Sequence, residues 1–241
     1  MKLLVIIPAY NEQENITRVV DNLTQDYPQY DYVVVNDGGH DSTARICRER
    51  GYHLLSLPIN VGLAGAFQCG MKYAYKNGYD AAVQLDADGQ HLPQYIAPML
   101  DQLAQGYDIV AGSRYVCKKK PWSLRMLGSR VISTAIKLTT GQTYKDPTSG
   151  MRMYNCDMIK IFAKEQNHSP EPDTISYLLR RGLRLAEVQV TMEERIAGKS
   201  YLSAMRSVKY MLRMGVSILL VQWFRGGTEL VHTDTPKEAK K

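Results

Sequence analysis

The chain has 241 residues, of which 44% are hydrophobic and 22% are charged, as expected for one large globular domain or a domain with an appendage. Its longest uncharged apolar run near the C-terminus, MGVSILLVQWF, falls well short of the ~20 residues needed to span a bilayer. The opening run LLVIIP is too short for a signal peptide, and the four cysteines lack the spacing of a disulfide framework or zinc site. A cytoplasmic protein is therefore expected.

The positive charge of the chain is concentrated in one segment. The formal net charge is +6, yet the 37 residues between Asp108 and Asp146 contain no acidic residue. This segment alone has a charge of +8, carried by Arg114, Lys118, Lys119, Lys120, Arg125, Arg130, Lys137 and Lys145. Such a concentration indicates an anionic partner, which is a phosphate group, a nucleic acid or an anionic membrane surface.

The first half of the chain alternates between short apolar runs and amphipathic runs. Strands are expected at residues 2–8, 30–37, 52–58, 79–86 and 107–113, and helices at 11–26, 41–51, 64–78 and 93–106. Near-continuous apolar strands between helices predict an α/β domain with a mostly parallel sheet and helices on both faces. Ligands bind beyond the carboxyl ends of such strands, so residues 8–12, 36–37 and 86–90 are expected to line one crevice.

After Gly112 this alternation stops. A basic loop leads to a helix from about residue 122 to 140, the turn KDPTSG, a short strand MRMY and two further helices. The last strand, RLAEVQVTM, is followed by a loop, EERIAGKS, and a helix over residues 200–224. The sequence therefore predicts one α/β domain at residues 1–199, an amphipathic helix at 200–225 and a disordered tail at 226–241.

The predicted last helix has the pattern of an interfacial helix. Its basic residues recur at spacings of three and four and share one face, while apolar residues fall on another. The basic set is Arg206, Lys209 and Arg213, and the apolar set is Met205, Val208 and Leu212. Such a helix lies in a membrane interface, packs on the domain core or packs on a partner membrane protein.

Two carboxylates, Asp86 and Asp88, follow a buried strand in the run AAVQLDADGQH. An unpaired carboxylate at that position is costly without a counter-charge, although DADG alone also suits a plain turn. A hard divalent cation, Mg²⁺ or Mn²⁺, bound by one or two carboxylates and by substrate phosphates would supply the charge. Gln90 or His91 would support these ligands without binding the cation directly. Because substrate phosphates complete the ligands of the cation, the pattern predicts a phosphate-bearing substrate.

The ends of the first two strands suit a nucleoside. The run IPAYNE lacks the GxGxxG of dinucleotide-binding enzymes, and the chain has no P-loop. Tyr10 offers a ring for base stacking, Glu12 an acceptor for ribose hydroxyls and Asp37 an acceptor for a base imide N–H. Core packing of Tyr10 and a turn or helix-start role for Asp37 are the alternatives.

Taken in order, seven motifs resemble those of the family 2 glycosyltransferases with the GT-A (Rossmann-like) fold. They are IPAYNE, VVVNDGGHDST, NVGLAGAFQCG, LDADGQH, AGSRY, DPTSGMRMY and EERIAGKS, and they cover about residues 2 to 205. Within the family the chain is most similar to dolichol-phosphate-mannose synthase and bacterial polyprenyl-phosphate glycosyltransferases.

The resemblance implies a role for each matching position. Pro8, Tyr10, Glu12 and Asp37 would hold the nucleoside, while Asp86, Asp88 and Gln90 would hold the metal on the diphosphate. Asn36 stands where many members of the family have a second Asp, and it is left without a role.

The same resemblance places the acceptor in the acid-free segment. Arg114 and Arg125, with Arg130 as a third, would hold an acceptor phosphate. Asp146 would be a general base or an anchor of its loop, and Arg195 and Lys199 would close over the diphosphate or the acceptor.

The implied activity is inverting transfer of a hexose from a UDP- or GDP-linked sugar to a polyprenyl (undecaprenyl) phosphate, for cell-envelope polysaccharide or glycan modification. The alternative is transfer to a sugar hydroxyl, with Asp146 or Asp173 as base. A nucleic-acid surface is disfavoured because the basic segment lies beside acidic motifs and lacks an RNA-binding signature. The protein is expected at the inner face of the cell membrane, bound peripherally or through a small membrane partner. The sequence also leaves open whether the chain forms a homo-oligomer.

Overall fold

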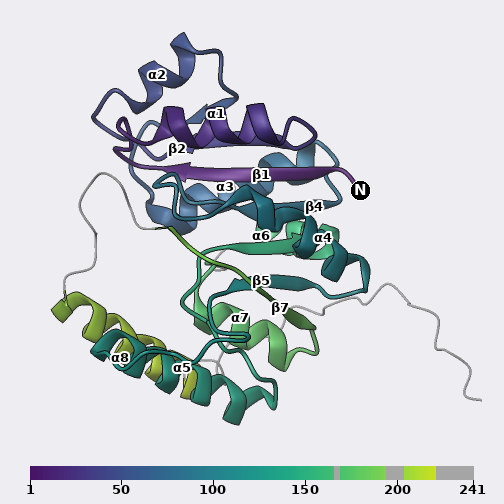
Figure 1. Ribbon diagram of the computed structural model, residues 1–241, viewed down its shortest axis with the longest axis vertical. Helices are drawn as coiled ribbons and strands as arrows, with labels where there is room; N and C mark the ends of the chain where they lie inside the picture. The colour runs from purple at the N-terminus through teal and green to yellow at the C-terminus, as the bar shows by residue number, and fades with distance from the viewer. Residues whose placement is uncertain (166–168, 194–203, 221–241) are drawn as a thin grey trace, which may run out of the picture.

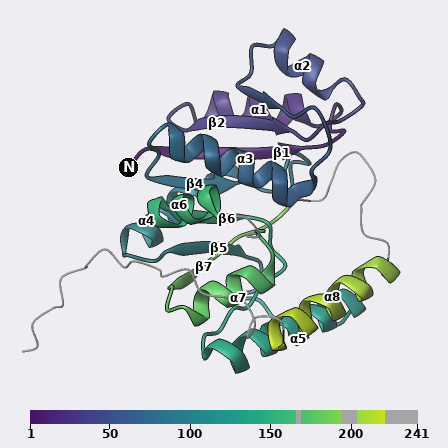
Figure 2. The same ribbon diagram turned by 180° about the vertical axis from the view of Figure 1, so that it is seen from behind.

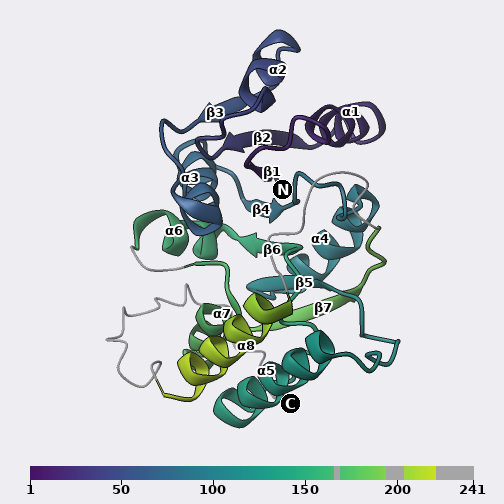
Figure 3. The same cartoon turned by 90° about the vertical axis from the view of Figure 1, so that its left-hand side faces the viewer.

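The computed structural model describes residues 1–165, 169–193 and 204–220. Within these residues one seven-stranded sheet runs through the molecule in the order β3-β2-β1-β4-β6-β5-β7 (Figure 3). The strands are β1 (Leu3–Ala9), β2 (Asp31–Asn36), β3 (Leu54–Ser56), β4 (Ala81–Gln84), β5 (Ile109–Ser113), β6 (Arg152–Asn155) and β7 (Leu185–Gln189). All neighbours pair in parallel except β6, which is antiparallel to both β4 and β5. The mostly parallel α/β sheet predicted from the sequence is confirmed.

The helices cover both faces of the sheet, as predicted. Side chains alternate along β1, with Leu4 and Ile6 entering one apolar cluster and Val5 and Ile7 the other. The second cluster is covered by α1 (Ile16–Asp26), α2 (Thr43–Glu49) and α4 (Ile96–Ala104), which follows the 3₁₀ turn η1 (Pro93–Tyr95) (Figure 1). The first is covered by α3 (Gly62–Lys76), α5 (Leu124–Thr140), α6 (Cys156–Lys164), α7 (Pro172–Arg180) and α8 (Ala204–Leu219) (Figure 2).

Several helices begin later than the sequence pattern predicted, and for two of them the local structure gives the reason. The first was expected from residue 11, but α1 begins at Ile16 because Asn11 has a positive φ of 55°, which is incompatible with a helix. The helix expected from about residue 122 begins at Leu124 because Ser123 caps it, its hydroxyl accepting from the backbone N–H of Met126 at 3.2 Å. Gly141, with a φ of 73°, ends that helix in a left-handed cap.

The helices α5, α7 and α8 gather at the end of the molecule beside β7, opposite α2 (Figures 1 and 3). None of the helices in the described part of the chain is long and apolar enough to cross a membrane. Several predicted features lie outside the described residues, namely the boundaries at residues 199, 200 and 225, the predicted end of the last helix at residue 224, and the tail.

Candidate active site

A pocket of about 450 Å³ lies at the carboxyl ends of β1, β2 and β4. Its volume is in the range of small-molecule sites. Six residues predicted from the sequence border it together, namely Pro8, Tyr10, Glu12, Asp37, Asp86 and Asp88. The structure therefore brings the three strand-end motifs into one crevice, as the parallel sheet requires.

The turn after β1 is held by contacts to the start of α2. The backbone N–H of Glu12 donates to the Thr43 hydroxyl at 2.9 Å, and the Glu12 carboxylate accepts from the Asn15 amide at 2.7 Å. Asn11, which the sequence analysis left without a role, accepts from the backbone N–H of His40 at 2.9 Å through its side-chain oxygen. These bonds fix the wall of the pocket that carries Tyr10 and Glu12.

Asp37 is buried at the end of β2 and holds the loop between β3 and α3 beside the pocket. Its Oδ1 accepts from the backbone N–H of Val61 at 2.7 Å. Gly38 has a φ of 62°, and a Cβ there would lie 2.3 Å from the Ile59 carbonyl carbon, so only glycine permits this approach. Asp37 thus anchors a loop as well as bordering the pocket, and its contact with a base remains a prediction.

The loop that Asp37 anchors supplies pocket residues that the sequence analysis missed. Asn60, Gly62, Leu63 and Ala66, from the end of this loop and the start of α3, border the same pocket. The motif NVGLAGA was a signal for this wall, but nothing in its composition indicates which side chains face a ligand.

The carboxylates of Asp86 and Asp88 are positioned by different partners. Asp86 Oδ1 accepts from the Gln84 amide at 2.9 Å, and its Oδ2 lies 3.7 Å from Nε2 of the buried His91. Asp88 is 5% exposed, and its Oδ1 accepts from the backbone N–H of Gln90 at 3.0 Å. Arg18 of α1 donates to the Asp88 carbonyl at 3.2 Å and so supports the turn from outside.

The donor set of this crevice fits a divalent cation that shares its ligands with a phosphate group. Asp86 and Asp88 offer the hard carboxylate oxygens that Mg²⁺ and Mn²⁺ prefer. Among the described residues, no three His, Cys, Asp or Glu side chains gather into a cage that would hold a metal alone. Gln90 turns its amide to the Glu193 carbonyl at 3.1 Å, so its predicted role toward a metal gains no support from this geometry.

Arg114 and Asp146 form a bidentate ion pair. Arg114 Nε donates to Asp146 Oδ2 at 2.7 Å and its Nη2 donates to Oδ1 at 2.9 Å. Burial raises the pKa of the Asp146 carboxyl, but the hydrogen bonds and charge of Arg114 outweigh this effect and hold the pKa below its usual value. Of the two roles left open for Asp146, the geometry favours the loop anchor, and the charge of Arg114 is largely balanced within the protein.

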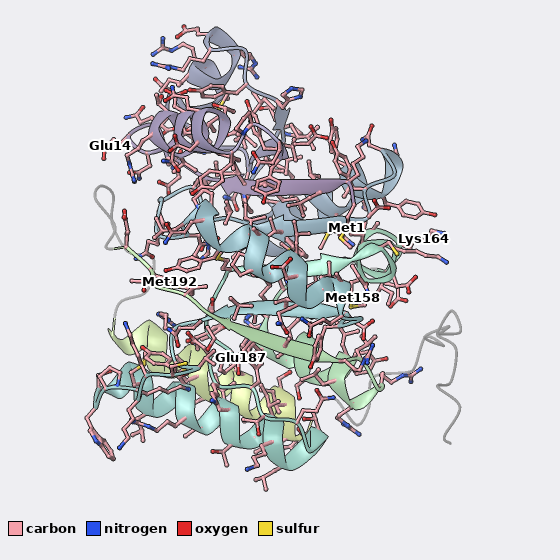
Figure 4. The ribbon with its side chains drawn as sticks, turned by 45° about the vertical axis from the view of Figure 1, so that its right-hand side comes forward. Met1, Glu14, Met158, Lys164, Glu187 and Met192 are labelled. Carbon is pink, nitrogen blue, oxygen red and sulfur yellow. The ribbon has the colours of Figure 1, made fainter. Side chains whose placement is uncertain are left out.

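The turn that contains Asp146 connects the Arg114–Asp146 ion pair to Asp86, which borders the pocket. Glu187 of β7 (labelled in Figure 4) accepts from the backbone N–H groups of Lys145 and Asp146 at 2.8 and 2.9 Å. At the other end of the turn, a Cβ on Gly150 would lie 2.9 Å from Asp86 Oδ2. A displacement of this turn would therefore be transmitted to Asp86.

A second hollow, here called the basic groove, lies between α5 and the loop before it. It has a volume of about 750 Å³. Among the described residues no carboxylate borders it, and six cationic side chains do, namely Lys118, Lys119, Lys120, Arg130, Lys137 and Lys145. Arg130 Nη2 donates to the Lys120 carbonyl at 2.7 Å, whereas its buried Nη1 has no hydrogen-bond partner among the described residues. Burial lowers the pKa of the Lys120 ammonium. The groove is thus suited to an anionic group.

Three of the predicted cations cannot be placed in this geometry. Arg125 lies in the first turn of α5, but its side chain is outside the described part of the structure, and Arg195 and Lys199 lie outside the described residues altogether. Asp173, the other candidate base, is buried in α7, where its Oδ2 accepts from Ser217 of α8 at 2.7 Å.

Comparison with known proteins agrees with this geometry. Residues 4–162 match the family described as Glycosyl transferase family 2, and the chain belongs to that family. It is 30% identical over 216 residues to polyprenol monophosphomannose synthase of Mycolicibacterium smegmatis, covering 84% of this chain and 81% of the relative. It is 32% identical to undecaprenyl-phosphate mannosyltransferase of Micrococcus luteus, covering 84% of this chain and 88% of that protein.

Solved structures share the fold. Glucosyl-3-phosphoglycerate synthase from Mycobacterium tuberculosis, in complex with phosphoglyceric acid, superposes with a TM-score of 0.69 at 17% identity, covering 94% of this chain and 81% of that one. A mannosyltransferase from Pyrobaculum calidifontis, in complex with GDP-Man and Mn²⁺, superposes with a TM-score of 0.66 at 18% identity, covering 94% and 65%. At such identities the likeness establishes the GT-A fold, which confirms the predicted fold class.

Proposed function

We propose that this glycosyltransferase transfers a hexose from a nucleotide-diphosphate sugar to a polyprenyl phosphate. Two relatives at about 30% identity are a polyprenol monophosphomannose synthase and an undecaprenyl-phosphate mannosyltransferase. Each matches this chain over most of its own length. The pocket at the carboxyl ends of β1, β2 and β4 is the donor site. Tyr10 stacks on the base, Glu12 accepts from the ribose and Asp37 faces the base.

Asp86 and Asp88 face the diphosphate of the donor. They would bind Mg²⁺ or Mn²⁺, which when bound neutralises the charge that develops on the leaving nucleoside diphosphate. Solved structures of the same fold contain Mn²⁺ with UDP or GDP-Man. The turn at residues 146–150, packed on Asp86 through Gly150, keeps this carboxylate at the edge of the donor pocket.

The transfer itself is a single displacement with inversion. An oxygen of the acceptor phosphate attacks the anomeric carbon of the sugar, a C–O bond forms there, and the bond to the diphosphate oxygen breaks. The nucleoside diphosphate leaves with the electron pair. A phosphate oxygen is already anionic near pH 7, so this step needs no general base, unlike attack by a hydroxyl group.

One observation favours the phosphate acceptor over a sugar hydroxyl. The two carboxylates that would serve as base for a hydroxyl are both buried and engaged, Asp146 with Arg114 and Asp173 with Ser217. A base paired with an arginine has a low pKa and is a poor proton acceptor. The basic groove, with Arg130 in it, supplies instead the cations that a phosphate requires.

We further propose how the active site closes and where in the cell the protein is located. Arg195 and Lys199 would close over the diphosphate, and the last helix would hold the protein at the inner face of the cell membrane, directly or through a membrane partner. The product would serve cell-envelope polysaccharide or glycan modification.

A donor and acceptor screen tests the proposed function. The purified protein is incubated with Mn²⁺ and a panel of UDP- and GDP-sugars, with either detergent-solubilised undecaprenyl phosphate or a neutral polyprenol as acceptor. We expect glycolipid with the phosphate and none with the alcohol. Transfer to the alcohol or to a free sugar at an equal rate contradicts the phosphate acceptor.

A further inference from the structure

The helices α5 and α8 form a paired layer at one end of the molecule. They lie side by side in all three ribbon views (Figures 1–3). Their contact is close, because a Cβ on Gly128 of α5 would lie 2.6 Å from Cγ of Met211 on α8. Met214 and Ile218 bury the inner side of α8 in the core. The outer side of this pair is a surface of its own.

The outer side of α5 carries an apolar stripe that the fold leaves exposed. Leu127, Val131 and Leu138 are exposed, Leu138 to 77%. Their spacings of four and seven residues place them within about 40° of each other around the helix. Ile132 and Ile136, on the opposite side of α5, are fully buried. The helix is therefore apolar on two sides, and only one of them belongs to the core.

α8 repeats this arrangement. Leu212, Val216 and Leu219 are exposed, Leu212 to 67%, and their spacings of four and three residues again define one stripe. Because Met211 meets α5 while Leu212 is exposed beside it, this stripe borders the junction of the two helices. The α5 stripe borders the same junction, since Gly128 directly follows Leu127. The two stripes form one apolar surface across both helices.

The charges around this surface have one sign. Neither helix contains an acidic residue, so every charged side chain on the pair is a cation. Among the described side chains, Lys137 and Arg130 flank the stripe on α5, and Lys209 and Arg213 flank it on α8. A second copy of the chain docked here would bring cations against cations, which disfavours self-association.

The basic groove opens on the flank of the same layer. It is lined by residues of α5, of the loop before it and of the segment that follows it, residues 143–145. Trp122, one of the residues that line it, is 90% exposed, with the Arg130 guanidinium 4.7 Å from the centre of its ring. An exposed indole beside lysines is typical of protein surfaces that lie at the boundary between lipid tails and headgroups.

We propose that the outer surface of α5 and α8 docks on an anionic lipid bilayer, with the stripes entering the acyl boundary and the basic groove facing headgroup phosphates. The α5 stripe and Trp122 form half of this surface. An apolar strip between rows of cations matches an anionic bilayer in both chemistry and charge. The proposal rests on the proposed function in that a polyprenyl acceptor lies in a membrane.

Vesicle sedimentation without donor or acceptor tests the docking. The full chain is mixed with vesicles of phosphatidylglycerol and phosphatidylcholine, or of phosphatidylcholine alone. We expect binding to the anionic vesicles, weakening as salt rises, and roughly tenfold less binding for the double variant Leu138→Gln/Leu212→Gln. Lys118→Gln/Lys119→Gln should lose a similar share of the salt-sensitive binding. Ile59→Gln and Lys76→Gln, exposed on other parts of the fold, should bind as wild type.

The controls separate docking from catalysis and from other occupants. Thermal unfolding checks that the variants are folded, and transfer to detergent-solubilised polyprenyl phosphate is measured apart from vesicle binding, so either result stands if the other fails. Wild-type binding by both double variants overturns the proposal, as does equal binding to neutral vesicles. A concentration-dependent dimer that the Leu138→Gln/Leu212→Gln variant abolishes would instead assign this surface to a second copy.

Discussion

The guanidinium of Arg114 and the fully buried carboxylate of Asp146 join the end of β5 to the turn that packs on Asp86. Asp146→Asn removes the anion and leaves a largely buried cation. We expect a loss of about 3 kcal/mol in the free energy of unfolding, the low end for a broken buried pair, because 22% of the Arg114 side chain stays exposed. Urea denaturation measures this loss. Asp101→Asn, on the exposed side of α4, is the matched control and should change little.

The stability supplied by this pair should depend on pH in the acid range. The folded-state pKa of Asp146 lies below its ordinary value of 3.8, so the stabilisation is complete above the unfolded pKa and is lost as pH falls through the folded value. The difference in unfolding free energy between wild type and Asp146→Asn should be constant from pH 7 to about 5. It should shrink below about pH 4. A difference that stays constant down to pH 3 would show that another interaction accounts for it.

Asp88 is expected to be essential for transfer but not for folding. Asp88→Asn removes a carboxylate at the donor pocket while its side chain can still accept from the Gln90 N–H. We expect a loss of a hundredfold or more in kcat, in the range seen when one stabilising group is removed from a charged transition state. Initial rates with Mn²⁺, and with EDTA added, give the measurement. Full activity in EDTA would contradict the role assigned to the metal.

Tyr10 should contribute to donor binding through its ring. Removing an aromatic ring that stacks on a base costs about 1–3 kcal/mol, which is roughly fivefold to a hundredfold in affinity. Tyr10→Ala should raise the KM for the nucleotide-sugar by such a factor, with little change in the KM for the lipid acceptor. Tyr10→Phe keeps the ring and should remain near wild type. Equal effects of the two variants would assign the contribution to the hydroxyl group.

The donor half of the site was largely predictable from the sequence. Parallel strands place their carboxyl ends at one edge, so Pro8, Asp37 and Asp86 had to meet once the strands were recognised. The sequence pattern did not indicate the pocket residues that come from the loop between β3 and α3. Asn60 and Leu63 reach the pocket because Asp37 captures the backbone of Val61, and such a contact across 24 residues has no periodic signal.

The acceptor half was predictable only as a concentration of charge. The acid-free segment indicated an anion site. The sequence could not show that Arg114 is paired with Asp146, or that Arg130 keeps a buried N–H with no partner among the residues that the structure describes. Nor could it show which of the two apolar sides of α5 packs on the core. Both depend on tertiary contacts between segments far apart in the chain.

Arg130 is the cation of the basic groove that we expect to matter most for the acceptor. Its Nη2 is held by the Lys120 carbonyl, so the guanidinium is already oriented when a phosphate arrives, and within the described part of the chain its buried Nη1 has no partner. A hydrogen bond to a charged group contributes about 1.5–3 kcal/mol. Arg130→Ala should therefore raise the KM for polyprenyl phosphate by about tenfold to a hundredfold. The KM for the nucleotide-sugar should stay near wild type, because Arg130 does not border the donor pocket.

Two further variants make the test of Arg130 specific. Arg130→Lys keeps the charge but loses the planar fork, so it should recover only part of the acceptor affinity. Arg48→Ala removes an exposed cation of α2, at the far end of the molecule, and controls for the change in net charge. Assays in detergent exclude an effect through the bilayer. If Arg130→Ala weakens the donor as much as the acceptor, the acceptor phosphate does not bind in the basic groove.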